Sequence, residues 1–429
     1  MASEHEISVD RLQVGVFVQL DLGWMDHPFS FNSFKIRSEE QLRTIRQLGL
    51  TTVRWDPQRS DVNPLPQAAP VAAAEPSGAP APAPVAKVAP EVVAAKQARI
   101  QRLAEHRQRI AQVQGEFVRS SKIARTLGQT IFSLPDETLA DARSLVEQMV
   151  DTLLSAPDLA IHVMSEQASG EDGYSHPLNV SVLAMILARE MRLPAELVKL
   201  VGLGALFHDI GLSQVPQRLV NSPGPQTKAE REFYELHCQY GLDIGKKAGL
   251  PAAALQIIYQ HHELYDGSGY PQGLKGERID LLARILSLVD TFETQCNPPN
   301  PAQALTPHEA LAQMFAQHRV RFDPKLLQLF IRFMGVYPAG TVVSLSNGGL
   351  AMVIAVNASR PLKPTVVVYD PDVPKHEAIV LDLADEGEVN ISRAIRPDKL
   401  LPQVFDYLSP QRRVSYYFDP GSQPDGAPA

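Results

Sequence analysis

Short alternating runs of apolar and polar residues open the chain. Residues 7–21 read ISVDRLQVGVFVQLD and follow the period of two that is typical of β-strands. A helical period follows from Ser38 to Leu48, where Ser38 and Gln41 form a capping box and Gly49 stands at the C-cap position. Residues 1–60 are therefore predicted to form a small α+β module.

A change of composition marks the end of this module. Residues 61–95 consist almost entirely of Ala, Pro, Val and small polar residues, with no aromatic side chain and no apolar period. Such a segment cannot bury enough surface to offset the entropy of ordering it, and its prolines favour extended geometry. We interpret it as a semi-rigid linker.

Helical periodicity dominates the middle of the chain. Residues 96–156 are predicted to be connecting helices, the first as far as residue 125 and the second from Pro135 to Leu154. We expect the first to pack on the next domain, and a homodimer formed through residues 96–125 is the alternative. From Ser175 to Met334, amphipathic helices alternate with turns that contain Gly or Pro.

The period of two returns after Gly335. The run TVVSLSNGGLAMVIAV places Asn347-Gly348 between two β-rich segments, which is a strong hairpin signal. Residues 336–408 are therefore predicted to form a small β-rich module, and residues 409–429 a flexible tail. The predicted fold class is mainly α, with a small N-terminal α+β module and a small C-terminal β module.

Composition narrows the functional classes. The 429 residues suffice for two or three domains, and their net charge of −8 argues against a partner that is a nucleic acid polymer. Two cysteines exclude a disulfide scaffold and a cysteine-based zinc finger. The sequence has neither a signal-peptide pattern nor an apolar run long enough for a bilayer, so we expect a cytoplasmic protein that does not span a membrane.

Histidines carry the candidate chemistry. Five of the 12 fall near the ends of predicted helices within residues 176–262. They are His176, His208, His237, His261 and His262. Asp209 follows the second of them, and Asp290 lies inside the apolar helix LLARILSLVDTF, where a carboxylate is costly unless it is paired or bound to a metal.

Each of these residues alone has an ordinary explanation, such as capping or half-buried packing. Together, five imidazoles and two carboxylates in one helical domain favour a site for two or more Mn, Fe or Zn ions, because no thiolate takes part. We interpret the histidines outside this series as surface residues. Those considered are His27, His106, His308, His318 and His376.

The series resembles the HD-GYP family of cyclic di-GMP phosphodiesterases. The most specific part is HHELYDGSGYPQGLKGERI, residues 261–279, with His208-Asp209-Ile-Gly before it and Arg284 and Asp290 after it. The resemblance covers roughly residues 157–335 and implies an all-helical metal-binding bundle that is the catalytic domain. Residues 1–60 are similar to a small module often found ahead of such domains.

The resemblance also implies a ligand set for two divalent transition-metal ions, with iron or manganese expected ahead of zinc. One ion would be held by His176, His208, Asp209 and Asp290, and the second by His237, His261 and His262, with Asp209 bridging. Some members bind a third ion through an acidic residue one turn before the first histidine. That position is Asp172 here, in an Asp-Gly for which a simple turn is the alternative.

The implied reaction is hydrolysis of cyclic di-GMP to pGpG, GMP or both by a hydroxide that bridges the metals, with His208 and Asp209 as the catalytic pair. Tyr270 is expected to place its ring beside a guanine, with a purely structural turn as the alternative. Arg284 is expected to contact a phosphate, with a salt bridge to Glu263 or Asp266 as the alternative. The loop around Tyr270 is also the expected docking surface for a GGDEF-type diguanylate cyclase.

Two departures from the family pattern remove positive charge. The family usually reads His-Asp-Ile-Gly-Lys, but this chain has Leu212 at the lysine position, and an Arg-Pro-Tyr-Arg-like segment is replaced by residues 296–300, CNPPN. We expect the metal site to survive and turnover to be reduced. There are two alternatives. The first is a catalytically weak or inactive protein that acts as a sensor of cyclic di-GMP or as a docking module for a cyclase. The second is an HD hydrolase that acts on another nucleotide.

Overall fold

The computed structural model describes residues 5–23, 26–29, 32–66, 90–155, 160–164, 176–220, 226–356, 360–371, 373–385, 389–410 and 414–419. The chain divides into two compact units. The smaller unit comprises Met1–Glu105, Leu345–Leu350 and Val367–Leu381, and the larger comprises His106–Ser344, Ala351–Val366 and Asp382–Ala429. Among the described residues, 56% are helical. The predicted class, mainly α with a small sheet module towards each end, is confirmed.

The N-terminal module is an antiparallel four-stranded sheet with one helix. The strands are β1 (His5–Ser8), β2 (Phe17–Gln19), β3 (Ser33–Lys35) and β4 (Thr52–Trp55), in the order β1-β4-β2-β3. Helix α1 (Glu39–Gln47) begins after Ser38, whose side chain accepts a hydrogen bond from the backbone N–H of Gln41. The predicted capping residue is therefore confirmed.

Three of the histidines interpreted as surface residues, His27, His308 and His318, are buried or half-buried. His27 is fully buried in the N-terminal module, where its Nε2–H donates to Asn32 Oδ1 (2.8 Å) and its Nδ1 accepts from the backbone N–H of Phe29 (3.2 Å). His308 is half-buried and donates to the carbonyl of Val336 (2.7 Å). The surface interpretation was therefore wrong for His27, whose ring partners lie five and two residues further along the chain. His308 is bound by a residue 28 positions away, which the sequence pattern does not display.

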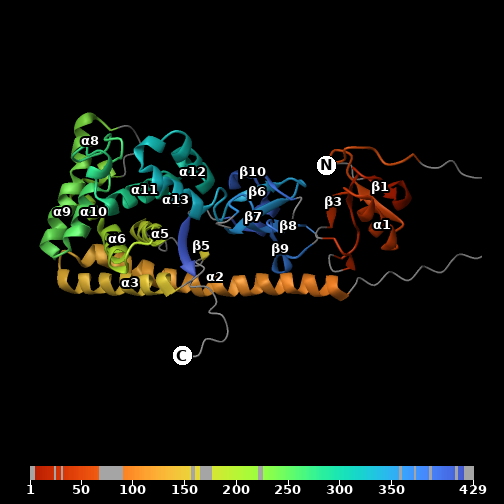
Figure 1. Ribbon diagram of the computed structural model, residues 1–429, viewed down its shortest axis with the longest axis horizontal. Coiled ribbons are helices and arrows are strands. Elements are labelled where there is room, and N and C mark those ends of the chain that lie inside the picture. Colours follow the sequence, from red (N-terminus) through yellow and green to blue (C-terminus); the bar gives the residue numbers. More distant parts are fainter. Residues whose placement is uncertain are drawn as a thin grey trace, which may run out of the picture. The chain divides into compact units, whose positions relative to one another are not determined.

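Most of the helices belong to the larger unit (Figure 1). They are α3 (Pro135–Ser155), α5 (His176–Glu190), α6 (Ala195–Phe207), α7 (Gln217–Val220), α8 (Lys228–Glu235), α9 (His237–Ala248), α10 (Ala252–Gln260), α11 (Leu281–Cys296), α12 (Pro307–Ala316), α13 (Pro324–Met334) and α14 (Pro402–Leu408). Helix α2 (Pro90–Thr130) belongs to the larger unit from His106 onwards. Helix α5 is the centre of this bundle, because every residue from Leu178 to Ala188 is buried. It lies beside α6 and contacts α3 and α11.

Helix α2 is longer than the sequence pattern predicts. It begins at Pro90, within the expected linker, and continues to Thr130. Proline is well tolerated in the first turn of a helix, so composition alone placed the start too late. From Val113 onwards its buried residues join the main core of the helical unit. None of the described helices combines the length and the apolar character needed to cross a membrane.

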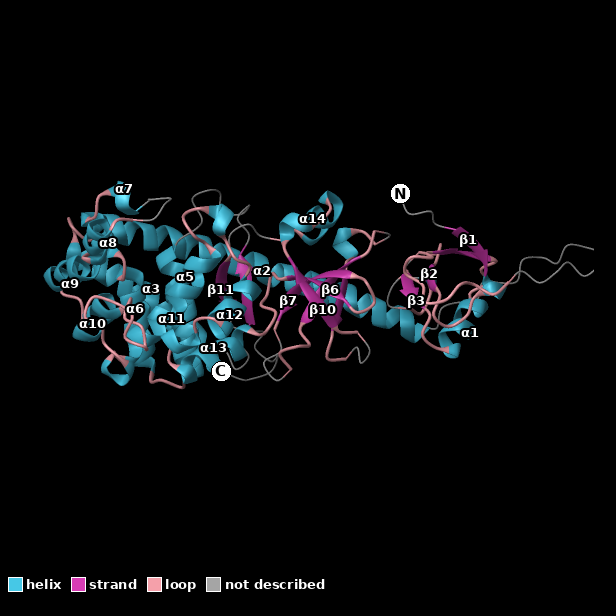
Figure 2. Cartoon of the chain, turned by 90° about the horizontal axis from the view of Figure 1, so that it is seen from above, coloured by secondary structure: helices cyan, strands magenta, loops and turns pink. Residues whose placement is uncertain are grey.

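The β-rich module is a five-stranded sheet (Figure 2). Its strands are β6 (Val342–Leu345), β7 (Leu350–Ala355), β8 (Thr365–Tyr369), β9 (Ile379–Asp382) and β10 (Ile391–Ile395), in the order β10-β6-β7-β8-β9. Strands β6 and β7 form the hairpin predicted at Asn347-Gly348, with Gly348 at a φ of +82°. Helix α14 (Pro402–Leu408) follows the last of these strands.

The expected flexible tail contains a buried strand. Residues Ser415–Asp419 form β11, which pairs antiparallel with β5 (Ala160–Met164) and packs against α5. Tyr416, Tyr417 and Phe418 are buried in the main core. The expectation of a tail is therefore wrong for these residues, because three adjacent aromatic side chains outweigh the Pro/Gly-rich composition around them.

Candidate metal centre

The five candidate histidines lie at the ends of helices. His176 begins α5, His208 follows α6, and His237 begins α9. His261 and His262 follow α10, whereas Asp290 lies within α11. His237 follows a short break between two helices, because α8 ends at Glu235 and Leu236 separates it from α9.

Close backbone packing brings two of these helix ends together. A Cβ atom on Gly211 would lie 2.0 Å from the carbonyl oxygen of His237, so the turn after Asp209 can contact α9 only if this residue is glycine. A Cβ atom on Gly241, one turn further along α9, would lie 2.8 Å from Cγ2 of Ile258 on α10. The two glycines allow α6, α9 and α10 to approach closely enough for their histidines to meet.

The first donor group, which we name the His176 group, consists of His176, His208 and Asp290. The Nε2 atoms of the two histidines are 3.2 Å apart. Asp290 Oδ1 is 3.3 Å from the Nε2 of His176 and 3.7 Å from that of His208. Three elements distant in sequence therefore direct one carboxylate and two imidazoles at one point.

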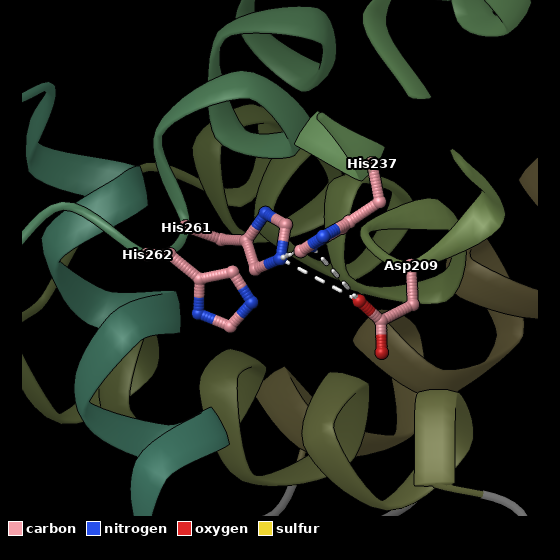
Figure 3. Close-up of side chains that lie close together, drawn as sticks. All are labelled: Asp209, His237, His261 and His262. Atoms are coloured by element: carbon pink, nitrogen blue, oxygen red, sulfur yellow. Dashed lines mark hydrogen bonds and ion pairs between the residues drawn. The ribbon is translucent and has the colours of Figure 1, made fainter. Parts of the chain in front are cut away.

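The second donor group, which we name the His237 group, consists of Asp209, His237, His261 and His262 (Figure 3). Asp209 Oδ1 is 3.7 Å from the Nε2 of His237 and 3.5 Å from that of His261. Its other oxygen, Oδ2, is turned towards the first group and lies 3.8 Å from His176 Nε2 and 3.4 Å from His208 Nε2. Asp209 therefore presents one oxygen to each group.

Backbone carbonyls fix the tautomers of three histidines in the same way. The Nδ1–H of each ring donates to the carbonyl three residues earlier, at 2.7 Å in every case. The pairs are His208 with Ala205, His237 with Tyr234, and His261 with Ile258. A neutral imidazole that donates through Nδ1 keeps a lone pair on Nε2. All three Nε2 lone pairs therefore face Asp209.

The contacts within both groups are suited to a cation. The Nε2 atoms of His237 and His261 are 3.3 Å apart, and both carry lone pairs beside a carboxylate oxygen. Acceptors that converge without a hydrogen between them repel one another, and either a proton or a metal ion relieves that repulsion. His262 Nε2 is buried and has no hydrogen-bond partner among the described residues. The residues present therefore fit divalent metal ions, for which imidazole and carboxylate donors are suited.

The charged neighbours set the protonation of the first group. Burial alone would lower the pKa of His176, but the carboxylates of Glu293 and Asp290 outweigh it and raise the pKa well above its usual value. Burial would raise the pKa of Asp290, and His176 and His208 instead hold it well below its usual range. The His176 group therefore attracts positive charge.

In the His237 group, the pKa values of His237 and His262 are shifted in the opposite direction. Burial and the neighbouring His261 lower the pKa of His237 to about 4 and hold that of His262 well below its usual value. Burial would raise the pKa of Asp209, but His208 and His261 lower it. At neutral pH His237 and His262 are therefore neutral and Asp209 is ionised, which are the forms that bind metal.

A buried glutamate behind the first group was missed in the sequence. Glu293 Oε2 accepts a hydrogen bond from His176 Nδ1 (2.6 Å), and its Oε1 accepts from Asn179 Nδ2 (2.8 Å) and Asn297 Nδ2 (2.9 Å). Only 1% of this residue is exposed. Glu293 stands three residues after Asp290 on α11, and this i,i+3 spacing was the signal that could have identified it.

Comparison with known proteins identifies the family. The HD domain model matches residues 148–326, a domain of unknown function (DUF3391) matches residues 4–149, and a KOW domain associated with HD domains matches residues 342–402. A cyclic di-GMP phosphodiesterase of Pseudomonas aeruginosa is 31% identical over 430 residues, which cover 97% of this chain and 98% of that protein. The chain belongs to the HD domain family. The resemblance drawn from the histidine series is thereby confirmed.

Other relatives match over shorter stretches. A cyclic di-GMP phosphodiesterase response regulator of Xanthomonas campestris is 33% identical over 155 residues, 36% of this chain and 41% of that protein. A 3'3'-cGAMP-specific phosphodiesterase of Vibrio cholerae is 27% identical over 190 residues, 43% of this chain and 36% of that protein. Among solved structures, an HDG"Y"P protein from Bdellovibrio bacteriovorus has a TM-score of 0.40 at 16% identity, covering 76% of this chain and 98% of that chain.

In this HD domain protein, the loop that follows the paired histidines packs against the second donor group. The Tyr270 ring lies 4.7 Å from that of His262, and its backbone N–H donates to the His262 carbonyl (3.1 Å). A Cβ on Gly269 would lie 2.3 Å from the same carbonyl, so glycine is required there. Glu263 holds the far side of the loop by accepting from the backbone N–H groups of Gln272 (2.7 Å) and Leu274 (2.8 Å).

Three further residues singled out in the sequence stand as follows. Arg284 forms its ion pair with Asp323 (2.7 Å), so the expected alternative of a salt bridge to Glu263 or Asp266 is wrong. The reason is that Glu263 is already occupied by backbone N–H groups, and the start of α13 places Asp323 beside α11. Leu212 is half-buried in the 3₁₀ turn Ile210–Gln214. Asp172 lies outside the described residues.

Proposed function

We propose that this HD domain protein is a metal-dependent phosphodiesterase that hydrolyses cyclic di-GMP to pGpG, GMP or both. The observation that carries the proposal is the position of Asp209, which turns one carboxylate oxygen to each of two groups of converging acceptors. The relatives named above as cyclic di-GMP phosphodiesterases, one of them similar along nearly the whole chain, support the same substrate.

The seven residues of the two donor groups would hold two ions, with Asp209 between them. Iron or manganese is proposed ahead of zinc, because the donors are imidazole and carboxylate without thiolate. When bound, such a pair lowers the pKa of a shared water and neutralises phosphate charge, and a bridging hydroxide is the nucleophile we propose. A third ion at Asp172 remains a proposal that rests on the family pattern alone.

The protein's own side chains prepare the site. The carbonyls behind His208, His237 and His261 hold the rings in one tautomer, so no reorganisation is needed when the site is filled. Burial raises the pKa of Tyr270 well above its usual value, so the phenol stays neutral and keeps its O–H as a donor. We propose that its ring and hydroxyl contact the substrate, beside the His237 group.

We propose that Arg284 acts less directly. Its guanidinium is bound to Asp323, which ties α11 to the start of α13. A direct contact to a substrate phosphate stays a prediction. So do docking of a GGDEF-type cyclase at the Tyr270 loop, dimerisation through residues 96–125, and a cytoplasmic location.

Turnover of labelled cyclic di-GMP by protein purified without oxygen tests the proposal. Wild type should release pGpG or GMP, and Asp209→Asn should release neither. Asp243→Asn is the matched control, because Asp243 is an exposed residue of α9 outside both donor groups. Turnover that survives in folded Asp209→Asn would refute the proposal.

A sensor is the second candidate, favoured by Leu212, which stands where the family has lysine. A metal-loaded wild type that binds cyclic di-GMP without hydrolysing it would establish that role instead.

A further inference from the structure

A cavity lies in the larger unit, apart from both donor groups. Its volume is about 540 Å³, and its walls come from the segment after α11, the start of α12, the first residues of the β-rich module, and the region from β10 to β11. None of its lining residues belongs to the His176 or His237 group. The lining residues used below are Cys296, Ala304, Thr341, Arg396, Asp398 and Val414.

The size and the walls suit a small organic molecule. Small-molecule sites in proteins commonly enclose about 300–1,000 Å³ and are lined mainly by apolar side chains with a few polar groups. Leu305, Pro307 and Phe405 contribute apolar surface here. The cavity therefore has both the volume and the character of a ligand site.

The charges of the cavity favour a neutral occupant. Arg396 and Asp398 are its charged lining residues among those described, and their charges are opposite. The guanidinium of Arg396 is also bound by Glu309, with Nε 2.7 Å from Oε1. An anionic ligand would therefore find the Arg396 guanidinium already paired with Glu309. A cationic ligand would find no net negative charge among the lining residues.

One buried hydroxyl in the wall has no partner. Only 3% of Thr341 is exposed, and its Oγ1 makes no hydrogen bond within the described part of the chain. Buried polar groups are nearly always hydrogen-bonded, and leaving one unpaired is unfavourable. The hydroxyl oxygen is itself buried, so a rotation of the Thr341 side chain about χ1 would bring it to an acceptor atom on a molecule in the cavity. Cys296, also 3% exposed, places a thiol in the same wall.

We propose that this cavity binds a neutral, largely apolar small molecule that carries a hydrogen-bond acceptor, and that its binding stabilises the His176 side of the metal centre. Val414 lines the cavity, and its N–H and C=O are both bound by the side chain of Asn297, at 2.9 and 2.8 Å. Asn297 donates in turn to Glu293 (2.9 Å).

The chain of contacts ends at a donor of the first group, because Glu293 accepts from His176 Nδ1 (2.6 Å). Asn297 belongs to the CNPPN segment, residues 296–300, which departs from the family's Arg-Pro-Tyr-Arg-like pattern. A ligand that orders Val414 also orders Asn297 and Glu293, and it should slow the departure of a metal ion from His176. This coupling rests on the proposed metal centre, whereas binding in the cavity does not.

Binding is tested with Nile red, a neutral apolar dye with a carbonyl acceptor, titrated into the full chain and followed by fluorescence. Wild type should bind it saturably at one site. Ala304→Trp, which fills the cavity, should abolish that binding, and Thr341→Val should weaken it by about threefold to tenfold. Ala316→Trp, at an exposed position at the end of α12, is the matched control and should bind as wild type does. Unchanged binding by folded Ala304→Trp would overturn the proposal.

The two cysteines give a second test that needs no cavity-filling variant. Burial raises the pKa of the Cys296 thiol, so N-ethylmaleimide should alkylate it only slowly in the native protein, and saturating Nile red should slow this labelling further. Cys238 is buried beside His237 and serves as the internal control, since the dye should not change its slow labelling. Mass spectrometry of the two peptides separates the cysteines. Bound dye that leaves Cys296 labelling unchanged would place the dye elsewhere and overturn the assignment.

Coupling is measured as the rate at which a chelator removes metal from the loaded protein. Nile red should slow this release by roughly twofold to thirtyfold in wild type and leave the rate unchanged in Asn297→Ala. If dye binding is normal but metal release does not respond, the coupling is refuted while the ligand site stands. If the protein holds no metal at all, the proposed metal centre fails instead.

Discussion

Replacing Glu293 by glutamine removes the charge behind His176 while preserving the volume of the side chain. The carboxylate accepts hydrogen bonds from His176, Asn179 and Asn297. A glutamine offers one oxygen and one NH₂ in its place. If the oxygen faces the two asparagines, the NH₂ faces His176 Nδ1. That nitrogen must then accept, and the proton moves to Nε2, where the metal would bind. In the opposite orientation, the NH₂ meets the NH₂ groups of the asparagines.

The expected loss of metal affinity follows from the loss of the hydrogen bond between His176 Nδ1 and the Glu293 carboxylate. Outer hydrogen-bond partners of metal-binding histidines are worth about tenfold to hundredfold in metal affinity, which corresponds to about 1.4–2.8 kcal/mol. A hydrogen bond to a charged acceptor contributes about 1.5–3 kcal/mol, so the two figures agree. Glu293→Gln should therefore bind metal about tenfold to hundredfold more weakly than wild type.

Competition with a chromogenic chelator measures this affinity, and a thermal melt confirms that the variant is folded. The matched control is Glu309→Gln, which removes the charge of a glutamate that caps α12 and lies in neither donor group. It should lose stability without losing metal affinity. If folded Glu293→Gln holds metal as tightly as wild type does, the hydrogen bond to His176 does not set the tautomer, and this account of the first group is wrong.

Three further predictions concern single positions. Leu212→Lys should remain folded, because Leu212 is only half-buried in a 3₁₀ turn. It should hydrolyse cyclic di-GMP about tenfold to hundredfold faster than wild type through a new contact to phosphate. A folded, metal-loaded variant that is no faster than wild type would contradict this. Gly211→Ala should lower the free energy of unfolding by about 1–3 kcal/mol and impair metal binding, because the added Cβ would meet the His237 carbonyl. Gly115→Ala is the control and should have neither effect, because the space around Gly115 is open. Equal stability of the two variants in urea denaturation would refute the packing argument. Burial lowers the pKa of His27 from 6.5 to about 4, so the unfolded chain binds the proton more readily and the stability of the N-terminal module should fall as the pH drops from 6.5 towards 4. His27→Gln should show a smaller loss, measured by tryptophan fluorescence because Trp24 and Trp55 both fall within residues 1–60; an identical pH profile would exclude His27 as the cause.

Local signals explain what the sequence predicted well. Helix ends are marked by short-range chemistry, so the order of the candidate histidines along the helices could be read directly. Ser38 accepts the bond that its capping box predicts, and Asn347-Gly348 makes the predicted hairpin turn. The arrangement of His176, His208 and Asp290 around one point needed the family resemblance, because three separate helices bring these residues together.

The features that were missed depend on partners distant in sequence. Glu293 resembles any acidic residue of an amphipathic helix until its bond to His176, 117 residues away, is seen. Strand β11 lies in a Pro/Gly-rich stretch and becomes a strand only because β5 and α5 cover its aromatic residues. For Arg284 the expected alternative to a phosphate contact was a salt bridge to Glu263 or Asp266, whereas its ion-pair partner, Asp323, is brought close by the packing of α13.

The central claim is that two ions lie on either side of Asp209, and a metal count tests it most directly. Elemental analysis of the full chain, purified without oxygen from cells supplied with iron and manganese, should find about two transition-metal ions per chain. Asp209→Ala should lose the most metal, because its carboxylate faces both donor groups, and His208→Ala should retain less than wild type. A wild type that holds no more metal than these two variants, when all three are folded, would contradict the account.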